Sequence, residues 1–156
     1  TSGLLFGGAK YPDMVVPTST MFDLYDQGIL DVTVLGFGQM DRQSINVGRF
    51  SGRVPGVGGI NNIAIAAKRL AIFCGRHFAD GNSKKFVEKV QSVSVSLKNI
   101  RAPIILIVTE LAVLRWRPLP EKIELLEINE GVKLEAVINS LPFEVSVSKK
   151  LEWRVA

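Results

Sequence analysis

The chain has 156 residues, of which 47% are hydrophobic and 22% charged, and its formal net charge is +4. This length fits one domain with a real core, and the weak, scattered positive charge lacks the basic stripe with interleaved aromatics that nucleic-acid binding needs. The longest apolar run, residues 102–108, is too short to span a bilayer, and no signal-like segment opens the chain. We therefore expect a cytoplasmic protein that binds neither nucleic acid nor membrane.

Cysteine and histidine are scarce, which limits metal and redox chemistry. Cys74 and His77 are the single residues of their types, so an internal disulfide is excluded and a zinc site lacks ligands. We expect no metal site, and we expect Cys74, inside the apolar run 70–74, to be a buried small hydrophobe. An alternative in which His77 and Asp80 form a triad with a serine rests on their spacing alone.

The first half of the chain alternates helical and strand-like patterns. Residues 1–12 are glycine-rich and indicate a loop, and residues 19–26 indicate a short helix that Ser19 or Thr20 would cap and that ends near Gly28. Further along, the pattern predicts a strand over 31–37, a glycine-rich loop over 53–62, an alanine-rich helix over 63–69 with two cations at its end, and a buried strand over 70–74.

The second half continues the alternation. The pattern predicts a charged helix over 83–89, strands over 90–96, 104–109, 112–116 and 122–128, an amphipathic helix over 131–140, and a strand over 143–147. Pro118 and Pro120 mark a turn. Alternating strands and helices predict an α/β fold, and no linker or repeat divides residues 1–156, so we expect one domain. The high apolar fraction indicates a sheet covered on both faces or a surface lost to a partner.

The glycine-rich loop is the most informative segment. Gly56, Gly58 and Gly59 precede a helix, and such a turn exposes backbone N–H groups to an anionic ligand. The spacing matches neither the dinucleotide-binding fingerprint nor the phosphate-binding P-loop. The loop therefore either contacts a ligand or makes a tight turn needed for packing.

Five segments together resemble the β-type half of family I coenzyme A-transferases, such as the succinyl-CoA:3-oxoacid and glutaconate CoA-transferases. The loop and helix resemble the GxGG segment of that family. The other four segments are residues 36–41 (GFGQMD), 76–77 with 84–89 (RH and KKFVEK), 108–114 (VTELAVL), and 130–132 with 143–148 (EGV and FEVSVS). They occur in the family's order over nearly the whole chain.

This resemblance implies an enzyme that moves CoA between an acyl-CoA and a carboxylic acid. It implies a three-layer α/β sandwich of the type shared with sugar-phosphate isomerases, with a mostly parallel sheet and ligand at the carboxyl ends of the strands. The active site would lie between this half and an α-type partner subunit. Coenzyme A would be a co-substrate, and no permanently bound cofactor is expected.

The resemblance also implies roles for individual residues. The N–H groups of Gly58 and Gly59 would stabilise an oxyanion on the thioester carbonyl. The expected substrate- and CoA-binding residues are Gln39 near the substrate carboxyl, Gly56 in the turn, Asn61 and Asn62 at the acyl or pantetheine portion, and Arg49 and Arg53 at a phosphate or carboxylate. Asn62 stands where some relatives have aspartate, and the two arginines fit a solvated surface equally well.

One departure from the family is decisive for the mechanism. Family members attack the thioester with a glutamate in an E-(N/S)-G-(V/L) motif, and the matching segment here begins with Thr1 (TSGL). Three interpretations stay open: Thr1 is a nucleophile freed by processing; a separate N-terminal chain precedes it and the glutamate is supplied elsewhere or lost; or Thr1 is an incidental start. The corresponding alternatives to a transferase are a CoA-thioester hydrolase that uses water, and a non-catalytic subunit that binds acyl-CoA or supports its partner.

Overall fold

The computed structural model describes residues 11–49, 52–78 and 85–154. These residues form a large and a small sheet with three α-helices: α1 (Thr18–Asp26), α2 (Ile60–Ala66) and α3 (Leu134–Ser140). The large sheet has the order β1-β4-β6-β7-β8-β9 and the small sheet the order β2-β3-β5. No helix in this part of the chain is long and apolar enough to cross a membrane.

The large sheet is mixed, with parallel pairing in the majority. Its strands are β1 (Val32–Gly36), β4 (Leu70–Cys74), β6 (Ile104–Val108), β7 (Ala112–Pro118), β8 (Glu121–Asn129) and β9 (Ser146–Arg154). The pairs β1–β4, β4–β6 and β8–β9 are parallel, whereas β7 is antiparallel to both neighbours. The connections on either side of β7 are too short for a crossover, which forces antiparallel pairing. The expected α/β class with a mostly parallel sheet is confirmed.

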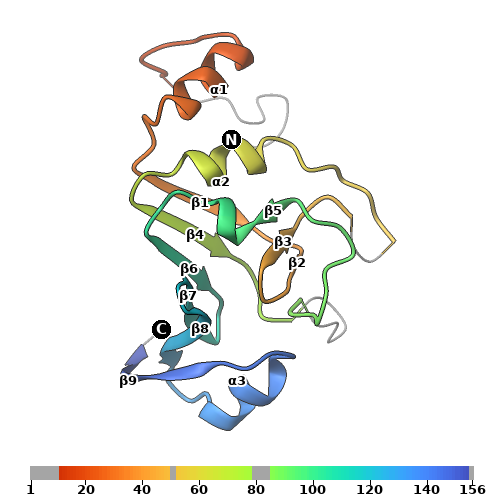
Figure 1. The fold of residues 1–156 in the computed structure, drawn as a ribbon, viewed down its shortest axis with the longest axis vertical. Coiled ribbons are helices and arrows are strands. Elements are labelled where there is room, and N and C mark those ends of the chain that lie inside the picture. The colour runs from red at the N-terminus through yellow and green to blue at the C-terminus, as the bar shows by residue number, and fades with distance from the viewer. Residues whose placement is uncertain (1–10, 50–51, 79–84, 155–156) are drawn as a thin grey trace.

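The small sheet consists of short strands that lie, in the order of the sequence, between strands of the large sheet. They are β2 (Gln39–Met40), β3 (Ser44–Asn46) and β5 (Val95–Ser96), followed by the 3-10 helix η3 (Leu97–Asn99). In Figure 1 the small sheet lies beside β1 and β4, while the large sheet continues down to β8 and β9, with α3 next to β9. The insertion therefore lies near the end of the large sheet that begins with β1.

One face of the large sheet carries the core. Phe73 of β4, Ile107 of β6 and Leu114 of β7 are completely buried, and they belong to a single cluster that also holds Ala64 of α2 and Val137 of α3. Burying these side chains is the main favourable term in folding, at about 25 cal/mol for each Å² of apolar surface removed from water.

The opposite face of β1, β4 and β6 is only partly covered; we call it the outer face. Its apolar members are Val32, Val34, Leu70, Ile72, Cys74, Ile104, Leu106 and Val108. Val32 is 49% exposed, Val34 62% and Ile104 37%. The prediction that Cys74 is buried is wrong in degree, because side chains alternate along a strand and Cys74 points away from the face that holds Phe73.

Several helices and strands begin or end at other residues than the sequence predicts. The helix α2 begins at Ile60 and ends at Ala66, so Lys68 and Arg69 follow it, and their N–H groups donate to Leu30 O and Asp31 O at 2.9 and 3.0 Å. Neither Ser19 nor Thr20 caps α1, whose N-cap position is Pro17 without a side-chain hydrogen bond. The predicted strand 143–147 begins later and runs on as β9.

The predicted helix over 83–89 is wrong for the part that the structure describes. Residues 85–87 lie extended beside β2, where Met40 N donates to Lys85 O at 2.8 Å and Val87 N donates to Met40 O at 2.9 Å. The strand expected over 90–96 is reduced to β5, because Val90 N donates to Asp41 Oδ2 and not to a strand. Backbone pairing with a distant segment has overridden the local helical preference.

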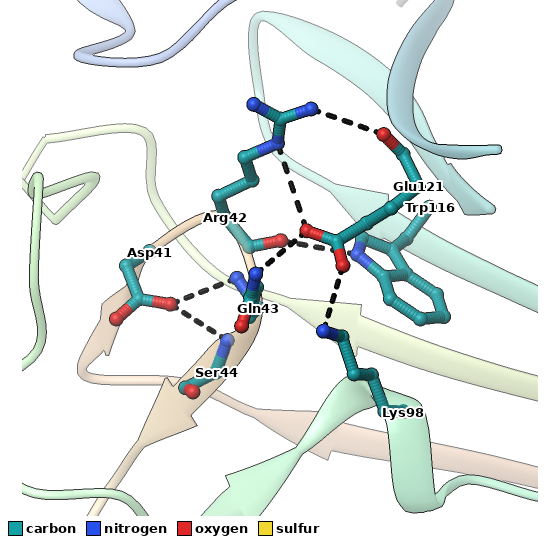
Figure 2. A network of polar contacts seen from close by, with 7 residues as sticks. All are labelled: Asp41, Arg42, Gln43, Ser44, Lys98, Trp116 and Glu121. Carbon is teal, nitrogen blue, oxygen red and sulfur yellow. Dashed lines mark hydrogen bonds and ion pairs between the residues drawn. The ribbon is translucent and has the colours of Figure 1, made fainter. Parts of the chain in front are cut away.

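A polar network joins the small sheet to the β7–β8 hairpin (Figure 2). Asp41 Oδ1 accepts hydrogen bonds from the backbone N–H groups of Gln43 and Ser44 at 2.8 and 2.7 Å, which fixes the β2–β3 turn. Trp116 Nε1 on β7 donates to Arg42 O of the same turn at 3.0 Å. The turn is thereby attached to the core strand β7.

Glu121 at the start of β8 completes this network. Its carboxylate accepts from Gln43 Nε2 and from Lys98 Nζ, both at 2.8 Å, and its backbone oxygen accepts from Arg42 at 3.0 Å (Figure 2). The hydrogen bond from Lys98 lowers the pKa of Glu121. Since the group is exposed to solvent, the network positions the turn more than it stabilises the fold.

Candidate functional site

An apolar cavity of about 500 Å³ opens at the carboxyl end of β1. Its lining residues come from the end of β1, the loop after it, the glycine-rich turn and α2: Leu35, Gly36, Phe37, Gly38, Val47, Pro55, Ile60, Ile63 and Lys85. Lys85 is the one charged residue in this lining. The carboxyl ends of strands are where open α/β sheets bind their ligands, and the size suits a small organic group.

The glycine-rich turn borders this cavity, since Pro55 and Ile60 at its two ends are both in the lining. Gly56 and Gly58 have φ angles of +84° and +54°, a conformation that favours glycine. Gly56 N donates to Gly48 O at 3.3 Å. Within the described residues, the N–H groups of Gly58 and Gly59 donate to no acceptor.

Gly58 and Gly59 directly precede α2 near the cavity, and among the described residues their amide groups have no backbone acceptor. Backbone N–H groups are strong donors that folded chains normally pair, and fixed donors stabilise negative charge that develops on a carbonyl oxygen. Gly59 also packs tightly, because a Cβ there would lie 2.4 Å from Cζ of Phe22 on α1. The turn is therefore held from one side, and the part of the chain that the structure describes leaves its two N–H groups available to a ligand.

None of the predicted site residues that the structure describes is itself in the cavity lining: Gly56, Gly58 and Gly59 lie in the turn between the lining residues Pro55 and Ile60, and the others lie further out. Asn61 and Asn62 are exposed on the first turn of α2, and Arg49 and Arg53 are exposed before the glycine turn. Gln39 lies in β2, where its Oε1 accepts from Asn46 Nδ2 at 2.9 Å, and its neighbour Gly38 is the residue that lines the cavity.

Asn46 is a positioning residue that the sequence interpretation missed. It is completely buried, and its Oδ1 accepts from the N–H groups of Gly48 and Arg49 at 3.1 Å each. Because this Asn-centred turn fixes the backbone around Val47, it shapes one wall of the cavity. The signal available in the sequence was Asn46 two residues before Gly48, a common turn pattern.

Lys85 was also missed, since its neighbourhood (KKFVEK) indicates a charged helix face. Its Nζ lies 3.3 Å from Phe37 O, to which it donates, and 5.4 Å from the centre of the Phe37 ring. The contact with an aromatic face is of the kind that attracts a cation.

His77 lies away from the cavity in a buried polar cluster. Its Nδ1 is 3.2 Å from Thr109 Oγ1 and its Nε2 is 2.7 Å from Ser140 Oγ on α3. Burial lowers the pKa of His77 in spite of the opposing effect of Glu110, so the ring is neutral near pH 7. The hydrogen bond to Ser140 attaches α3 to the segment that follows β4. Asp80, the other member of the hypothetical triad, lies outside the described residues.

Two further expectations concern Thr1 and a metal site. Thr1, which occupies the family's glutamate position, lies outside the described residues. Among the residues that are described, no group of three or more His, Cys, Asp or Glu side chains is placed to hold a metal ion.

The geometry defines the class: an α/β domain with a small-molecule cavity at the carboxyl end of a mostly parallel sheet. In sequence, the chain is 27% identical to acetate CoA-transferase YdiF of Escherichia coli (strain K12), over 97% of this chain and 32% of the relative. It is 29% identical to caffeate CoA-transferase of Acetobacterium woodii, over 94% of this chain and 32% of the relative. No protein-family model matches the chain.

Solved structures agree. The apoenzyme of acyl-CoA transferase YdiF from Escherichia coli O157:H7 matches with a TM-score of 0.85 and 27% identity, over 97% of this chain and 33% of that one. The same enzyme in a thioester complex with CoA matches with a TM-score of 0.83 and 27% identity, over 91% of this chain and 31% of that one. IpdAB of Rhodococcus jostii RHA1, at 23% identity and a TM-score of 0.72 over 90% of this chain and 61% of that one, shares the fold.

The similarity to CoA-transferases that the five segments indicate is confirmed in sequence and in fold. The chain spans about a third of the length of the curated relatives it matches. What those whole proteins do is therefore carried to this chain only as a proposal.

Proposed function

We propose that the chain forms the β-type half of a CoA-transferase, which moves CoA between an acyl-CoA and a carboxylic acid. The observation that carries this proposal is the glycine turn with free N–H groups at Gly58 and Gly59 beside an apolar cavity. The same architecture in an acyl-CoA transferase that forms a CoA thioester supports it.

In this proposal the cavity holds the acyl group and the turn acts on the thioester. A carboxylate attacks the thioester carbonyl, the amides of Gly58 and Gly59 donate to the oxyanion, and CoA leaves as the thiolate. The thiolate then attacks the carbonyl carbon of the enzyme's carboxyl group in this anhydride, which breaks the anhydride C–O bond, gives an enzyme–CoA thioester and releases the original acid as its carboxylate. Coenzyme A is thus a co-substrate.

Two parts of the proposed site remain to be assigned: the attacking carboxylate and the side chains that contact CoA. Since Thr1 occupies the family's glutamate position, we place the carboxylate on a second polypeptide segment. The exposed side chains near the turn, Arg49, Arg53, Asn61 and Asn62, are proposed to contact the polar portion of CoA. Gly56 shapes the turn, and Gln39 contributes through its bond to Asn46.

An α-type half is the proposed partner. The outer face exposes Val32, Val34 and Ile104, and parallel strands are normally covered on both faces. Contiguous exposed apolar side chains of this kind mark interaction surfaces.

The test is a mass-spectrometric assay of the chain together with its partner half. The complex is incubated with an acyl-CoA and a different acceptor acid, and both CoA thioesters are followed. Formation of the acceptor's thioester supports a transferase. Release of free CoA without exchange supports a hydrolase, the alternative suggested by threonine at the glutamate position. If the complex binds acyl-CoA but gives neither product, the chain is a non-catalytic subunit. Thr1→Ala separates the mechanisms further, since full activity in that variant excludes Thr1 as the nucleophile.

A further inference from the structure

Lys85 is held rigidly at the cavity by its backbone. Its carbonyl accepts from Met40 N at 2.8 Å, and the next residue but one, Val87, donates back to Met40 O at 2.9 Å. The intervening Phe86 is 1% exposed and points into the core. Since side chains alternate along an extended segment, Lys85 is directed to the other side, where it lines the cavity.

The ammonium group lies at the carboxyl ends of two adjacent parallel strands. Its Nζ donates to the carbonyl of Phe37, which follows β1, at 3.3 Å. A Cβ placed on Gly75, which follows β4, would lie 3.4 Å from the same Nζ. The ammonium group therefore lies next to the backbone at Gly75, at the place where parallel sheets bind ligands.

Among the described residues, no carboxylate pairs with Lys85. An ammonium group has three N–H donors, and Phe37 O accepts from one of them. Lys85 is half-buried, so its remaining N–H donors face the open side of the cavity, where they can bind an anion. The cavity lining is therefore apolar except for one cationic group.

We propose that Lys85 determines substrate specificity by binding the second carboxylate of a dicarboxylic substrate, either the acyl group or the acceptor acid. The inference rests on the proposed function, in which the first carboxyl carbon lies at the glycine turn as thioester or anhydride. A carboxylate at Lys85 must then be at the far end of the chain. The cavity of about 500 Å³ is large enough for a short acyl chain, and its lining includes both Lys85 and the ends of the glycine turn, Pro55 and Ile60.

The test compares two thioesters of equal chain length, glutaryl-CoA and pentanoyl-CoA, which differ in a terminal carboxylate. Binding is measured by calorimetry on the complex of the chain with its partner half, in three forms: the wild type, Lys85→Met, which keeps the apolar stem without the charge, and the matched control Lys89→Met, whose lysine is exposed and outside this cavity. The wild type should bind glutaryl-CoA roughly ten- to a hundredfold more tightly. Lys85→Met should lose this preference with an unchanged thermal midpoint, and Lys89→Met should keep it.

Equal affinity of the wild type for both thioesters overturns the proposal. So does an equal loss for both in Lys85→Met, which would assign the lysine to a CoA phosphate. If neither thioester binds the wild type, the proposed function fails, and NMR titration with free glutarate and pentanoate decides on Lys85. Glutarate-specific shifts at the amides of Gly36 and Gly75 that vanish in Lys85→Met keep the carboxylate site, and their absence in the wild type removes it.

Discussion

Gly58 combines a φ of +54° with open space where a side chain would begin. An alanine there is sterically allowed by the surroundings but disfavoured by the backbone, at roughly 1–2 kcal/mol. Gly58→Ala should lower the free energy of unfolding by about 1 kcal/mol, and relaxation of the turn should redirect its N–H groups. Acyl-CoA turnover should therefore fall at least about tenfold, as measured with the exchange assay.

Gly52 provides the control for this substitution. It also has a positive φ, +71°, and no heavy atom within 4 Å of an added Cβ. Gly52→Ala should cost a similar free energy of unfolding and leave turnover near the wild-type rate. Equal losses of activity in the two variants would mean that the turn matters only for folding.

His77 makes stability depend on pH in a defined window. Its pKa is lowered in the folded chain, so the unfolded chain binds a proton first as the pH falls below the ordinary histidine value near 6.5. The contribution of neutral His77 is complete above that value and is lost as the pH falls toward the lowered pKa. Urea unfolding should show a decline of up to about 1.4 kcal/mol per pH unit there.

The comparison variant for this decline is His77→Gln, which keeps hydrogen-bonding capacity without a titrating ring. Its unfolding free energy should be flat from pH 6.5 down to the ordinary glutamate pKa of 4.5, below which the unfolded chain takes up a proton at Glu121 before the folded chain does. A decline of the same slope in His77→Gln would assign the effect to other groups.

At the scale of elements, pairing between distant segments decides what local preference leaves open. The segment 85–96 has helical and strand-like patterns, yet Met40 and Asp41 bind its backbone and make most of it irregular. The helix α2 starts at Ile60, earlier than predicted, because Ile60 is buried in the core cluster. Packing stabilises short helices more than propensity does.

Trp116 is the element-scale link between the core and the β2–β3 turn. It is 2% exposed, and its Nε1 donates to Arg42 O. Trp116→Phe leaves that carbonyl without this donor and removes part of a buried ring, so the free energy of unfolding should fall by about 1–3 kcal/mol. Denaturant unfolding measures the change.

Trp153 on β9 offers a matched control, since it is 58% exposed. Trp153→Phe should change the unfolding free energy by less than about 0.5 kcal/mol. If the two tryptophan variants were equally stable, the contact between β7 and the β2–β3 turn would contribute nothing measurable.

At the scale of the whole molecule, the outer face is the feature that most needs a partner. Val34 in the edge strand β1 is 62% exposed. Val34→Lys places a charge that edge strands tolerate, so stability should change by less than about 0.5 kcal/mol. Copurification with the α-type half, and binding of the dye 8-anilinonaphthalene sulfonate by the free chain, should both decrease.

Val93→Lys is the control on another surface, since Val93 is 60% exposed and belongs to the segment before β5. It should leave copurification and dye binding unchanged. Equal behaviour of the two lysine variants would contradict the proposed interface.

The α/β class, most strands and the glycine turn follow from the sequence alone. These features depend on local properties, namely hydrophobic periodicity and the backbone freedom of residues such as Gly56 and Gly58. The order of five family-like segments likewise needs no coordinates. Local patterns were sufficient wherever neighbours in the chain determine the structure.

The tertiary structure alone decided which side chains meet at the cavity and which face of the sheet stays open. The charged pattern around Lys85 indicates a helix face, yet backbone pairing with Met40 brings Lys85 into the cavity lining. Asn46 acts through its turn, which positions the lining residue Val47. The partial exposure of Cys74 depends on what covers β4. Such features arise from the pairing of distant segments, whose free energy no short stretch of sequence contains.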